Sequence, residues 1–257
     1  MIRLVFLLRR KRSLTRESFQ TYWRTHHAPL VESLSSELGL VRYLQTHTVD
    51  DAKSARKARG EMETTYDGVA ELWWDDESKL EETLKTEAGL RAGKLLLDDE
   101  KKFIDLESSP LWFAYEYPQI NPTPETIIAE AGSSIKKVFF PLRHKLHLDE
   151  PEARKYWLTH HGPIVRRHGH DAGVICYRQV HRANSKLDAS MQKARGTKVN
   201  SYLGHAEAWI DPTAAESPKL AEQANKRFID DEMKFIDMNR STLFFGTEYS
   251  VVDERKR

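Results

Sequence analysis

The sequence has little cysteine, no excess of charge of either sign and no long apolar run. Its one cysteine, Cys176, excludes an internal disulfide and lies in an apolar stretch, where a small buried hydrophobe is a simpler interpretation than a nucleophile. Lys and Arg number 40 against 39 Asp and Glu, so no positive surplus attracts nucleic acid or an anionic membrane. The composition therefore predicts a partner that is neither of these.

We expect neither a membrane span nor a secretory signal. No segment approaches the roughly 18 apolar residues of a membrane span, and the N-terminal MIRLVFLLRRKRS places its basic residues after the apolar run, the reverse of a secretory signal. We therefore expect a cytoplasmic protein. At 257 residues and 39% hydrophobic, the chain is long enough for one large domain or two small ones.

An internal repeat organises the chain. YWRTHHAPLV recurs as YWLTHHGPIV, VRYLQTH as ICYRQVH, DDEKKFID as DDEMKFID, and KARG unchanged, all in the same order. We predict one repeat over residues 1–117, a proline-containing connector over 118–134 and a second repeat over 135–252.

Each repeat is predicted to fold as strand, helix, strand, strand, helix, strand. The first strands are IRLVFLL and KKVFFPL, and Asp149 with Glu152 forms a capping-box pattern at the start of the next helix. This βαββαβ order is the ferredoxin-like unit, which leaves one sheet face bare. We therefore predict an α+β protein whose two ferredoxin-like repeats pack sheet to sheet as an intramolecular barrel, with a cavity between the sheets.

The repeated motifs resemble the EthD family of the dimeric α/β-barrel superfamily. The resemblance rests on F-x-x-x-W-x-x-x-H-x-P-L-V, on YDGVAELW and on D-E-x-x-F-I-D, and it covers nearly the whole chain twice. The second copy has Ala153 where the first has Phe19. The resemblance implies a tandem fusion in which two halves do what two subunits do elsewhere. It also implies several possible activities, among them cofactor-free decarboxylases, dehydratases and cyclases that act on aromatic or polyketide compounds.

Period-2 alternation selects candidate cavity residues on the second strand of each repeat. The face that keeps its identities carries Tyr43, Gln45 and His47 in the first repeat, and Tyr177, Gln179 and His181 in the second. The opposite face is the more aliphatic one in the first repeat, so we place these six side chains on the barrel side as substrate-binding residues. His47 and His181 could instead reach solvent at the barrel rim.

The third strand adds a carboxylate beside a tryptophan. Glu71 with Trp73, and Glu207 with Trp209, share the face opposite to small apolar residues. A carboxyl group held against an indole in an apolar cavity has a raised pKa, which suits a general acid or base. We therefore predict catalytic glutamates next to substrate-binding tryptophans. The alternative is a structural tie to an arginine such as Arg42, or to a tyrosine.

The paired histidines form the third set of candidates. Imidazole titrates near neutral pH and is suited to proton transfer at the mouth of a cavity. The resemblance favours His27 and His161, the histidines of its H-x-P motif, as catalytic. His26 and His160 are then neighbouring substrate-binding residues.

A carboxylate of each DDE cluster is placed to orient the histidine, and Asp99 and Asp231 are our candidates. Two other interpretations remain open. The histidines could cap a helix C-terminus before Pro29, where the helix macrodipole favours a cation, or they could bind a metal. The sequence has no HExxH spacing, which makes a metal site the weakest option.

Two classes of function fit these features. The first is a cofactor-independent enzyme of lyase or isomerase type that decarboxylates, dehydrates, cyclises or cleaves a hydrophobic aromatic or polyketide-like molecule. The second is a non-catalytic small-molecule binding protein, and an oxygenase with haem or without cofactor is a further alternative. Homo-oligomers of the fused chain are also possible.

Overall fold

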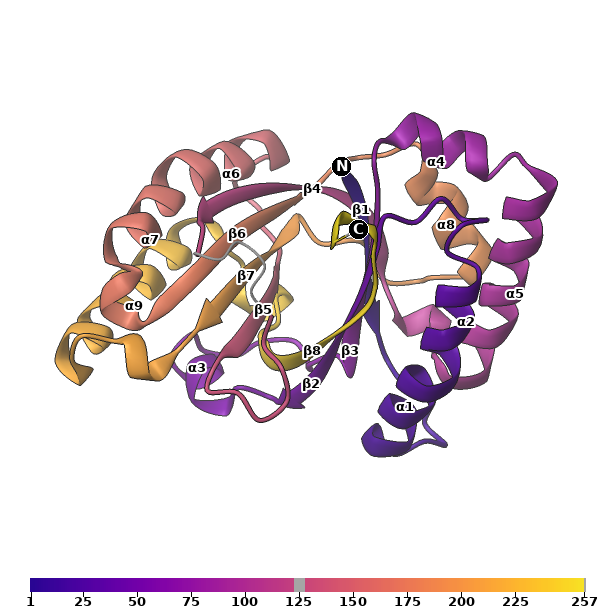
Figure 1. Ribbon diagram of the computed structural model, residues 1–257. Helices are drawn as coiled ribbons and strands as arrows, with labels where there is room; N and C mark the ends of the chain where they lie inside the picture. The colour runs from indigo at the N-terminus through magenta and orange to yellow at the C-terminus, as the bar shows by residue number, and fades with distance from the viewer. Residues whose placement is uncertain (123–127, 257) are drawn as a thin grey trace.

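A computed structural model describes residues 1–122 and 128–256, and its strands form one closed barrel (Figure 1). The strands are β1 (Ile2–Leu8), β2 (Arg42–Asp50), β3 (Gly68–Trp74), β4 (Leu111–Ile120), β5 (Lys136–Leu142), β6 (Val174–Arg182), β7 (Gly204–Ile210) and β8 (Phe244–Asp253). Their order around the barrel is β1-β3-β2-β8-β5-β7-β6-β4. The predicted connector, residues 118–134, includes residues outside the described ranges.

Each repeat contributes four consecutive strands to the barrel. The first supplies β4-β1-β3-β2 and the second β8-β5-β7-β6. The repeats join where β2 pairs with β8 and where β4 pairs with β6, and both of these pairings are antiparallel. The predicted α+β class and the intramolecular barrel are confirmed. The two sheets are continuous at both seams, so the barrel has no free edge strand.

Helices lie outside the barrel on two opposite sides (Figure 1). Those of the first repeat are α1 (Arg16–Tyr22), the π-helix η1 (Trp23–His27), α2 (Ala28–Ser33), α3 (Lys53–Lys57), α4 (Glu77–Thr83) and α5 (Glu87–Phe103). Those of the second are α6 (Glu150–Tyr156), the π-helix η3 (Trp157–His161), α7 (Gly162–His168), α8 (Leu187–Arg195) and α9 (Pro218–Phe235). Short 3₁₀ turns are η2 (Leu106–Ser108), η4 (His170–Ala172), η5 (Pro212–Ala214), η6 (Met238–Arg240) and η7 (Glu254–Lys256). No helix of the described chain combines the length and apolarity needed to cross a membrane.

Local sequence signals fix where these helices begin. Asp149 accepts a hydrogen bond from the amide of Glu152 at 2.7 Å, and the Glu152 carboxylate accepts one from the amide of Asp149 at 3.1 Å. This is the predicted capping box. Thr86 caps α5 in a simpler way, through its hydroxyl oxygen and the amide of Gly89. Ser217 caps α9 through the amide of Leu220, so both long helices that carry the DDE clusters, α5 and α9, are capped at their first turns.

The interior of the barrel is filled, and this overturns the predicted cavity between the sheets. One apolar cluster inside the barrel draws on both repeats, with members such as Val5, Val69, Phe139 and Phe244. Separate apolar clusters lie between the outer barrel face and the helices of each repeat. The two apolar cavities lie instead between the outer barrel face and the helices.

Candidate active site

Each His-His corner lies in a π-helical turn, η1 in the first repeat and η3 in the second. The amide of Ala28 donates to the carbonyl of Trp23, five residues earlier. This wider turn accommodates the ring of Pro29, which in a regular α-helix would clash with the carbonyl four residues before it. The helix continues into α2 instead of ending, so the histidines do not lie at a helix C-terminus and the alternative of a C-terminal cap does not apply.

The π-turn directs one histidine of each pair inward and the other outward. His27 and His161 are buried, whereas His26 and His160 are exposed. The outer rings stack on Tyr22 and Tyr156, with centroids 4.8 and 4.7 Å apart. The prediction that His26 and His160 bind substrate therefore places them wrongly, because their side chains lie on the surface.

The inner histidine of the first repeat is paired with an aspartate. His27 Nδ1 lies 2.8 Å from Asp99 Oδ2, and Asp99 also accepts hydrogen bonds from Tyr22 Oη at 2.7 Å and Lys102 Nζ at 3.0 Å. The hydrogen bond with His27 is the largest of the influences that hold the pKa of Asp99 well below its ordinary value. An ionised carboxylate only accepts, so His27 Nδ1 carries a proton and donates it. Nε2 is left as the ring nitrogen available to the cavity.

The second repeat reproduces this dyad. His161 Nδ1 lies 3.0 Å from Asp231 Oδ2, and Tyr156 and Lys234 donate to the same carboxylate at 2.7 and 3.1 Å. Burial alone would raise the pKa of Asp231, but these three hydrogen bonds outweigh it and lower the pKa to about 2. The expected pairing of histidine and aspartate is therefore present in both repeats.

An apolar cavity of about 300 Å³ adjoins the first dyad. It lies between the outer face of the sheet and the helices, so Trp23 and His27 line it together with the strand residues Tyr43 and Leu72. Gly68 lets the Trp23 ring lie directly against β3, since a Cβ at this position would lie 2.5 Å from that ring. The dyad thus faces an apolar space with few polar groups, as small-molecule sites commonly do.

A corresponding cavity of about 420 Å³ adjoins the second dyad. Trp157, His161 and Tyr177 occupy the places of Trp23, His27 and Tyr43, and Phe228 of α9 forms part of the opposite wall. The chain therefore holds two related sites, one under the helices of each repeat.

Each cavity is completed by a segment of the other repeat. Arg195, at the end of α8, lines the first cavity and donates to Glu100 at 2.8 Å. Arg59, just after α3, lines the second and binds both carboxylate oxygens of Glu232, at 2.7 and 2.9 Å. Figure 1 shows α8 beside α4 and α5 of the first repeat. Sequence reasoning missed these arginines, although the unchanged KARG motif was the signal that could have found them.

The second-strand candidates face the helices and not the barrel interior, which corrects their predicted placement. Leu44 pairs with Glu71 on the interior face, so Tyr43 and Gln45 point outward toward Trp23. The residues that alternate with these candidates, such as Leu44 and Val180, point into the barrel and pack in its interior. Tyr177 and Gln179 hold the same positions beside Trp157 in the second repeat.

His47 and His181 lie beneath these tryptophans. The His47 ring stacks on Trp23 with centroids 4.5 Å apart, and the His181 ring stacks on Trp157 at 4.4 Å. Both are buried, and burial lowers the pKa of each to about 3. They are neutral packing partners that neither reach solvent at a rim nor line the cavities.

Glu71 and Glu207 do lie inside the barrel, as predicted, but in an ion network that lines neither of the two apolar cavities. Glu71 binds Arg3 at 2.7 Å and Lys137 at 3.1 Å, and Glu207 lies 3.1 Å from Arg3. Trp73 and Trp209 pack against cations there, with Arg3 5.3 Å from the Trp73 ring and Lys137 4.8 Å from the Trp209 ring. The structure therefore separates the glutamates and tryptophans from the histidine dyads and makes them a tie across the barrel.

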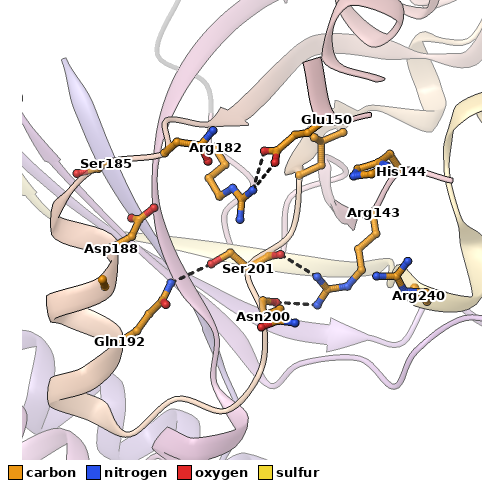
Figure 2. Close-up of a pocket in the computed structure, with 13 residues that line it drawn as sticks. Arg143, His144, Glu150, Arg182, Ser185, Asp188, Gln192, Asn200, Ser201 and Arg240 are labelled. Atoms are coloured by element: carbon orange, nitrogen blue, oxygen red, sulfur yellow. Dashed lines mark hydrogen bonds and ion pairs between the residues drawn. The ribbon is translucent and has the colours of Figure 1, made fainter. Parts of the chain in front are cut away.

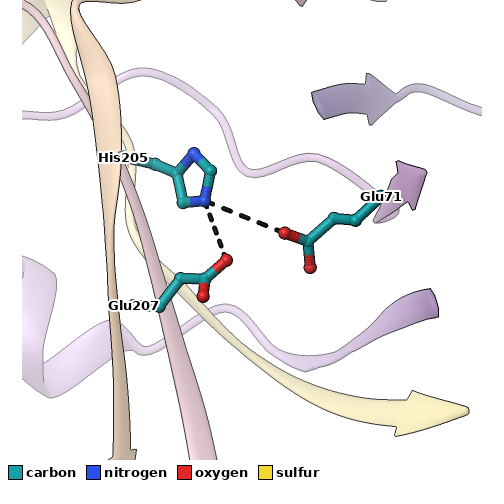
Figure 3. A group of neighbouring side chains, drawn as sticks. All are labelled: Glu71, His205 and Glu207. Carbon is teal, nitrogen blue, oxygen red and sulfur yellow. Dashed lines mark hydrogen bonds and ion pairs between the residues drawn. The ribbon is translucent and has the colours of Figure 1, made fainter. Parts of the chain in front are cut away.

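Figure 3 shows Glu71, His205 and Glu207 converging within this network. Their ligand atoms lie within 4.8 Å of one another, which is a spacing that could hold a metal ion. Arg3 and Lys137 already supply positive charge to the same carboxylates, so a divalent cation would have to displace them. The donor set is better explained as a salt-bridge network than as a metal centre.

The pKa values of the two central glutamates are shifted in opposite directions. Burial raises the pKa of Glu71, and the nearby Glu207 charge raises it further. Burial would also raise the pKa of Glu207, but Arg3 and Lys137 lower it well below its ordinary value. Glu248, bound to Lys137 at 2.8 Å, is a third carboxylate of this network. The raised pKa of Glu71 agrees with an excess of carboxylates over the two buried cations Arg3 and Lys137.

A polar pocket of about 580 Å³ lies elsewhere on the second repeat (Figure 2). Arg182 there binds the Glu150 carboxylate at 2.6 Å, and Arg143 donates to the carbonyls of Ser201 and Asn200 at 2.7 Å each. These guanidinium groups already have protein acceptors. The apolar cavities with their histidine dyads are therefore the better candidates for an active site.

The EthD domain matches the sequence over residues 11–107 and again over 145–239. These two segments cover most of the chain and contain both His–Asp dyads. The chain belongs to the EthD family. It is a tandem EthD protein, in which a single polypeptide forms both halves of a dimeric α/β barrel. No curated protein matches its sequence.

Solved structures similar to this EthD protein share little sequence with it. A proposed monooxygenase from Lactobacillus acidophilus is 9% identical with a TM-score of 0.48, and the alignment covers 98% of this chain and 96% of that one. A proposed monooxygenase from Fusobacterium nucleatum is 8% identical with a TM-score of 0.49, covering 96% and 91%. A chlorite dismutase variant from Candidatus Nitrospira defluvii is 12% identical with a TM-score of 0.43, covering 97% and 92%.

Proposed function

We propose that this protein is a cofactor-independent acid–base enzyme of lyase or isomerase type that acts on a hydrophobic aromatic or polyketide-like molecule. The observation that carries the proposal is the His–Asp dyad at the wall of an apolar cavity, present twice. We also infer from the strand orders β4-β1-β3-β2 and β8-β5-β7-β6 that each repeat is a ferredoxin-like unit.

The dyad is suited to accept and return a proton. With Nδ1–H donated to Asp99, the Nε2 lone pair of His27 can remove a proton from a bound carbon acid or hydroxyl group. The imidazolium that forms is stabilised by the adjacent carboxylate, which stays ionised because its pKa is low. The same nitrogen can then protonate the product or the leaving group. Such removal and return of a proton is what decarboxylation, dehydration or cyclisation requires.

The cavity supports an apolar substrate. Its wall is formed by aromatic and aliphatic side chains such as Phe6, Trp23 and Leu72, and exclusion of water strengthens the electrostatic influence of the dyad. The Glu100–Arg195 pair adds charged groups to this wall, and the two charges are paired with each other. A flat molecule with one or a few oxygen atoms matches this distribution better than a sugar or a nucleotide does.

The test is turnover of a substrate panel without added metal or cofactor. Aromatic β-keto acids, β-hydroxy acids and linear poly-β-ketones are incubated with the purified chain, and products are followed by mass spectrometry. The double variant His27→Ala, His161→Ala is expected to lose at least about a hundredfold in rate, the usual contribution of a general acid–base group. The melting temperature of each variant serves as the control for folding.

Three outcomes would redirect the proposal. Undiminished turnover in the double variant would remove the dyads from the mechanism. Saturable binding of the panel with no chemical change would favour the non-catalytic binding protein. An absorbance band of haem in the purified protein, or oxygen consumption with the panel, would favour the oxygenase alternative.

A further inference from the structure

The hydroxyl group of Tyr43 is held in an unusual way within the first cavity. Trp23 Nε1 donates to its oxygen at 2.9 Å, and Gln45 Nε2 donates to the same oxygen at 2.9 Å. Gln45 Nε2 also donates to the Trp23 carbonyl at 3.1 Å, which can only accept and so fixes the orientation of the amide. The Tyr43 oxygen therefore receives two hydrogen bonds, and its own proton must point elsewhere.

The second repeat keeps the arrangement in a looser form. Trp157 Nε1 donates to the Tyr177 oxygen at 3.2 Å, and Gln179 Nε2 lies 3.5 Å from the same oxygen. Gln179 Nε2 donates to the Trp157 carbonyl at 2.8 Å, so the amide has the same orientation as in the first repeat. The repeated Trp-Tyr-Gln set thus prepares a hydroxyl donor in both cavities.

Both tyrosines line their cavities, and both are buried from bulk solvent, with 1% and 3% of their surface exposed. Among the hydrogen bonds of residues 1–122 and 128–256, neither hydroxyl proton has an acceptor. A buried hydroxyl donor without an acceptor is costly unless a ligand or a water molecule satisfies it. Burial raises the pKa of Tyr43 and of Tyr177, so each keeps its proton and remains a donor.

We propose that Tyr43 and Tyr177 donate a hydrogen bond to an oxygen of the ligand, and that the ligands are flat apolar molecules bearing a carbonyl, enolate or phenolate oxygen. The cavity supplies the apolar contacts, and the tyrosine fixes the oxygen on a wall shared with His27 or His161. A donor placed there would also stabilise negative charge that develops on a carbonyl oxygen when the adjacent carbon loses a proton. The inference deepens the proposed function and rests on it only for the choice of cavity.

The test compares two ligands of nearly the same shape. 2-Acetonaphthone carries a ketone oxygen, and 2-isopropenylnaphthalene has a CH₂ group in its place. Binding of each to the full chain is measured by isothermal titration calorimetry. The double variant Tyr43→Phe, Tyr177→Phe is expected to bind the ketone about threefold to tenfold more weakly, the range of one neutral hydrogen bond, while its affinity for the hydrocarbon stays within about twofold.

A matched control and a spectroscopic signature complete the experiment. Tyr66→Phe removes a buried hydroxyl inside the barrel, where it contacts Tyr202 at 3.2 Å, and should leave both affinities unchanged. In the unmodified protein, the carbonyl stretch of bound 2-acetonaphthone should move to lower frequency than in an apolar solvent, and this readout does not depend on any variant folding.

The proposal is overturned if the ketone does not bind, if both ligands weaken equally in the double variant, or if the carbonyl stretch is not shifted. Because binding is measured without turnover, these results stand apart from the fate of the proposed function. Loss of turnover in the histidine variants with no tyrosine effect would leave the acid–base proposal intact and remove this one.

Discussion

In the first repeat, Leu72 and Trp74 wall the cavity at the end of β3, whereas Ala208 and Ile210 hold the corresponding positions on β7. The smaller side chains match the difference in volume, about 300 Å³ against about 420 Å³. The tryptophan, tyrosine, histidine and aspartate of each site are nevertheless the same. The comparison indicates two sites with one chemistry and different room for a ligand.

The polar surroundings of the two sites differ as well. Glu232 is held by both nitrogens of the Arg59 fork, whereas Glu100 has a single bond to Arg195 and a buried second oxygen with no protein partner among the described residues. The second cavity is thus closed by a more complete contact. Variants that affect only one repeat can separate what the halves share from what they do not.

The largest effect is expected where the halves meet inside the barrel. The double variant Glu71→Gln, Glu207→Gln leaves Lys137 with Glu248 and leaves Arg3 with only the more distant Glu116, 3.7 Å away, so it should cost about 3–5 kcal/mol in the free energy of unfolding. Either single variant should cost much less, because the remaining glutamate can carry the charge. Urea denaturation of the three variants measures this non-additivity.

The pH dependence of the same pair distinguishes its two members. The pKa of Glu71 is raised by burial, so the folded state retains its proton and the associated stability is lost as pH rises above the ordinary value of 4.5. The Glu71→Gln variant has no such proton to lose. Its free energy of unfolding, relative to that of the unmodified protein, should therefore be more favourable at pH 8 than at pH 4. Equal differences at both pH values would contradict this assignment.

Single histidine variants should divide the activity between the two sites. If both cavities work on the same substrate, His27→Ala and His161→Ala each remove one contribution, and together they remove at least about a hundredfold, or about 2.7 kcal/mol of transition-state stabilisation. A bulky substrate should depend more on His161, since the second cavity is larger. Rates for a small and a large substrate in both variants provide the measurement.

Arg59 and Arg195, which each reach the cavity of the other repeat, should contribute unequally to the free energy of unfolding. Arg59→Met removes two hydrogen bonds to a buried carboxylate and should cost about 2 kcal/mol in unfolding free energy, against about 1 kcal/mol for Arg195→Met. The reverse order would show that the bidentate geometry is not what closes the second cavity. Chemical denaturation of both variants at one pH decides between the two orders.

The smallest effect is expected at His205, whose counterpart in the first repeat is Val69. His205→Val loses a hydrogen bond to Glu207 at 2.8 Å but also removes a buried Nδ1 atom that has no partner among the described residues. These contributions oppose each other, so the free energy of unfolding should change by less than about 1 kcal/mol. A loss above about 2 kcal/mol would mean that this histidine is an essential member of the charge network.

Much of this arrangement could be predicted from the repeat alone. Eight apolar strands in two copies of one order, with helices between them, leave sheet faces that must be covered, and the barrel follows from that requirement. The inner histidine and its aspartate could also be selected, because their motifs recur at matching places in both copies. The hydrogen bonds that join η1 to α5 and η3 to α9 agree with the expected pairing of histidine and aspartate.

The side to which the second strand of each repeat turns its polar residues could not be predicted. Period-2 alternation separates Tyr43 from Leu44 but does not say which face is the interior, and the aliphatic set fills the barrel because the interior is packed solid. The cavities consequently lie beneath the helices. Glu71 was assigned to the correct face, but its role changed when Arg3 and Lys137 proved to lie beside it.

The sequence by itself determined the duplication, the order of elements and the residue types available for proton transfer, since these depend on local patterns that recur. Only the tertiary structure decided which of those residues meet. The π-turn that sends His27 inward and His26 outward results from fitting Pro29 into a continuing helix, and the exchange of Arg59 and Arg195 between halves results from closing the barrel. The arginine exchange joins segments far apart in the chain, and so does the contact between His27 and Asp99 that the π-turn permits. No local pattern specifies such contacts.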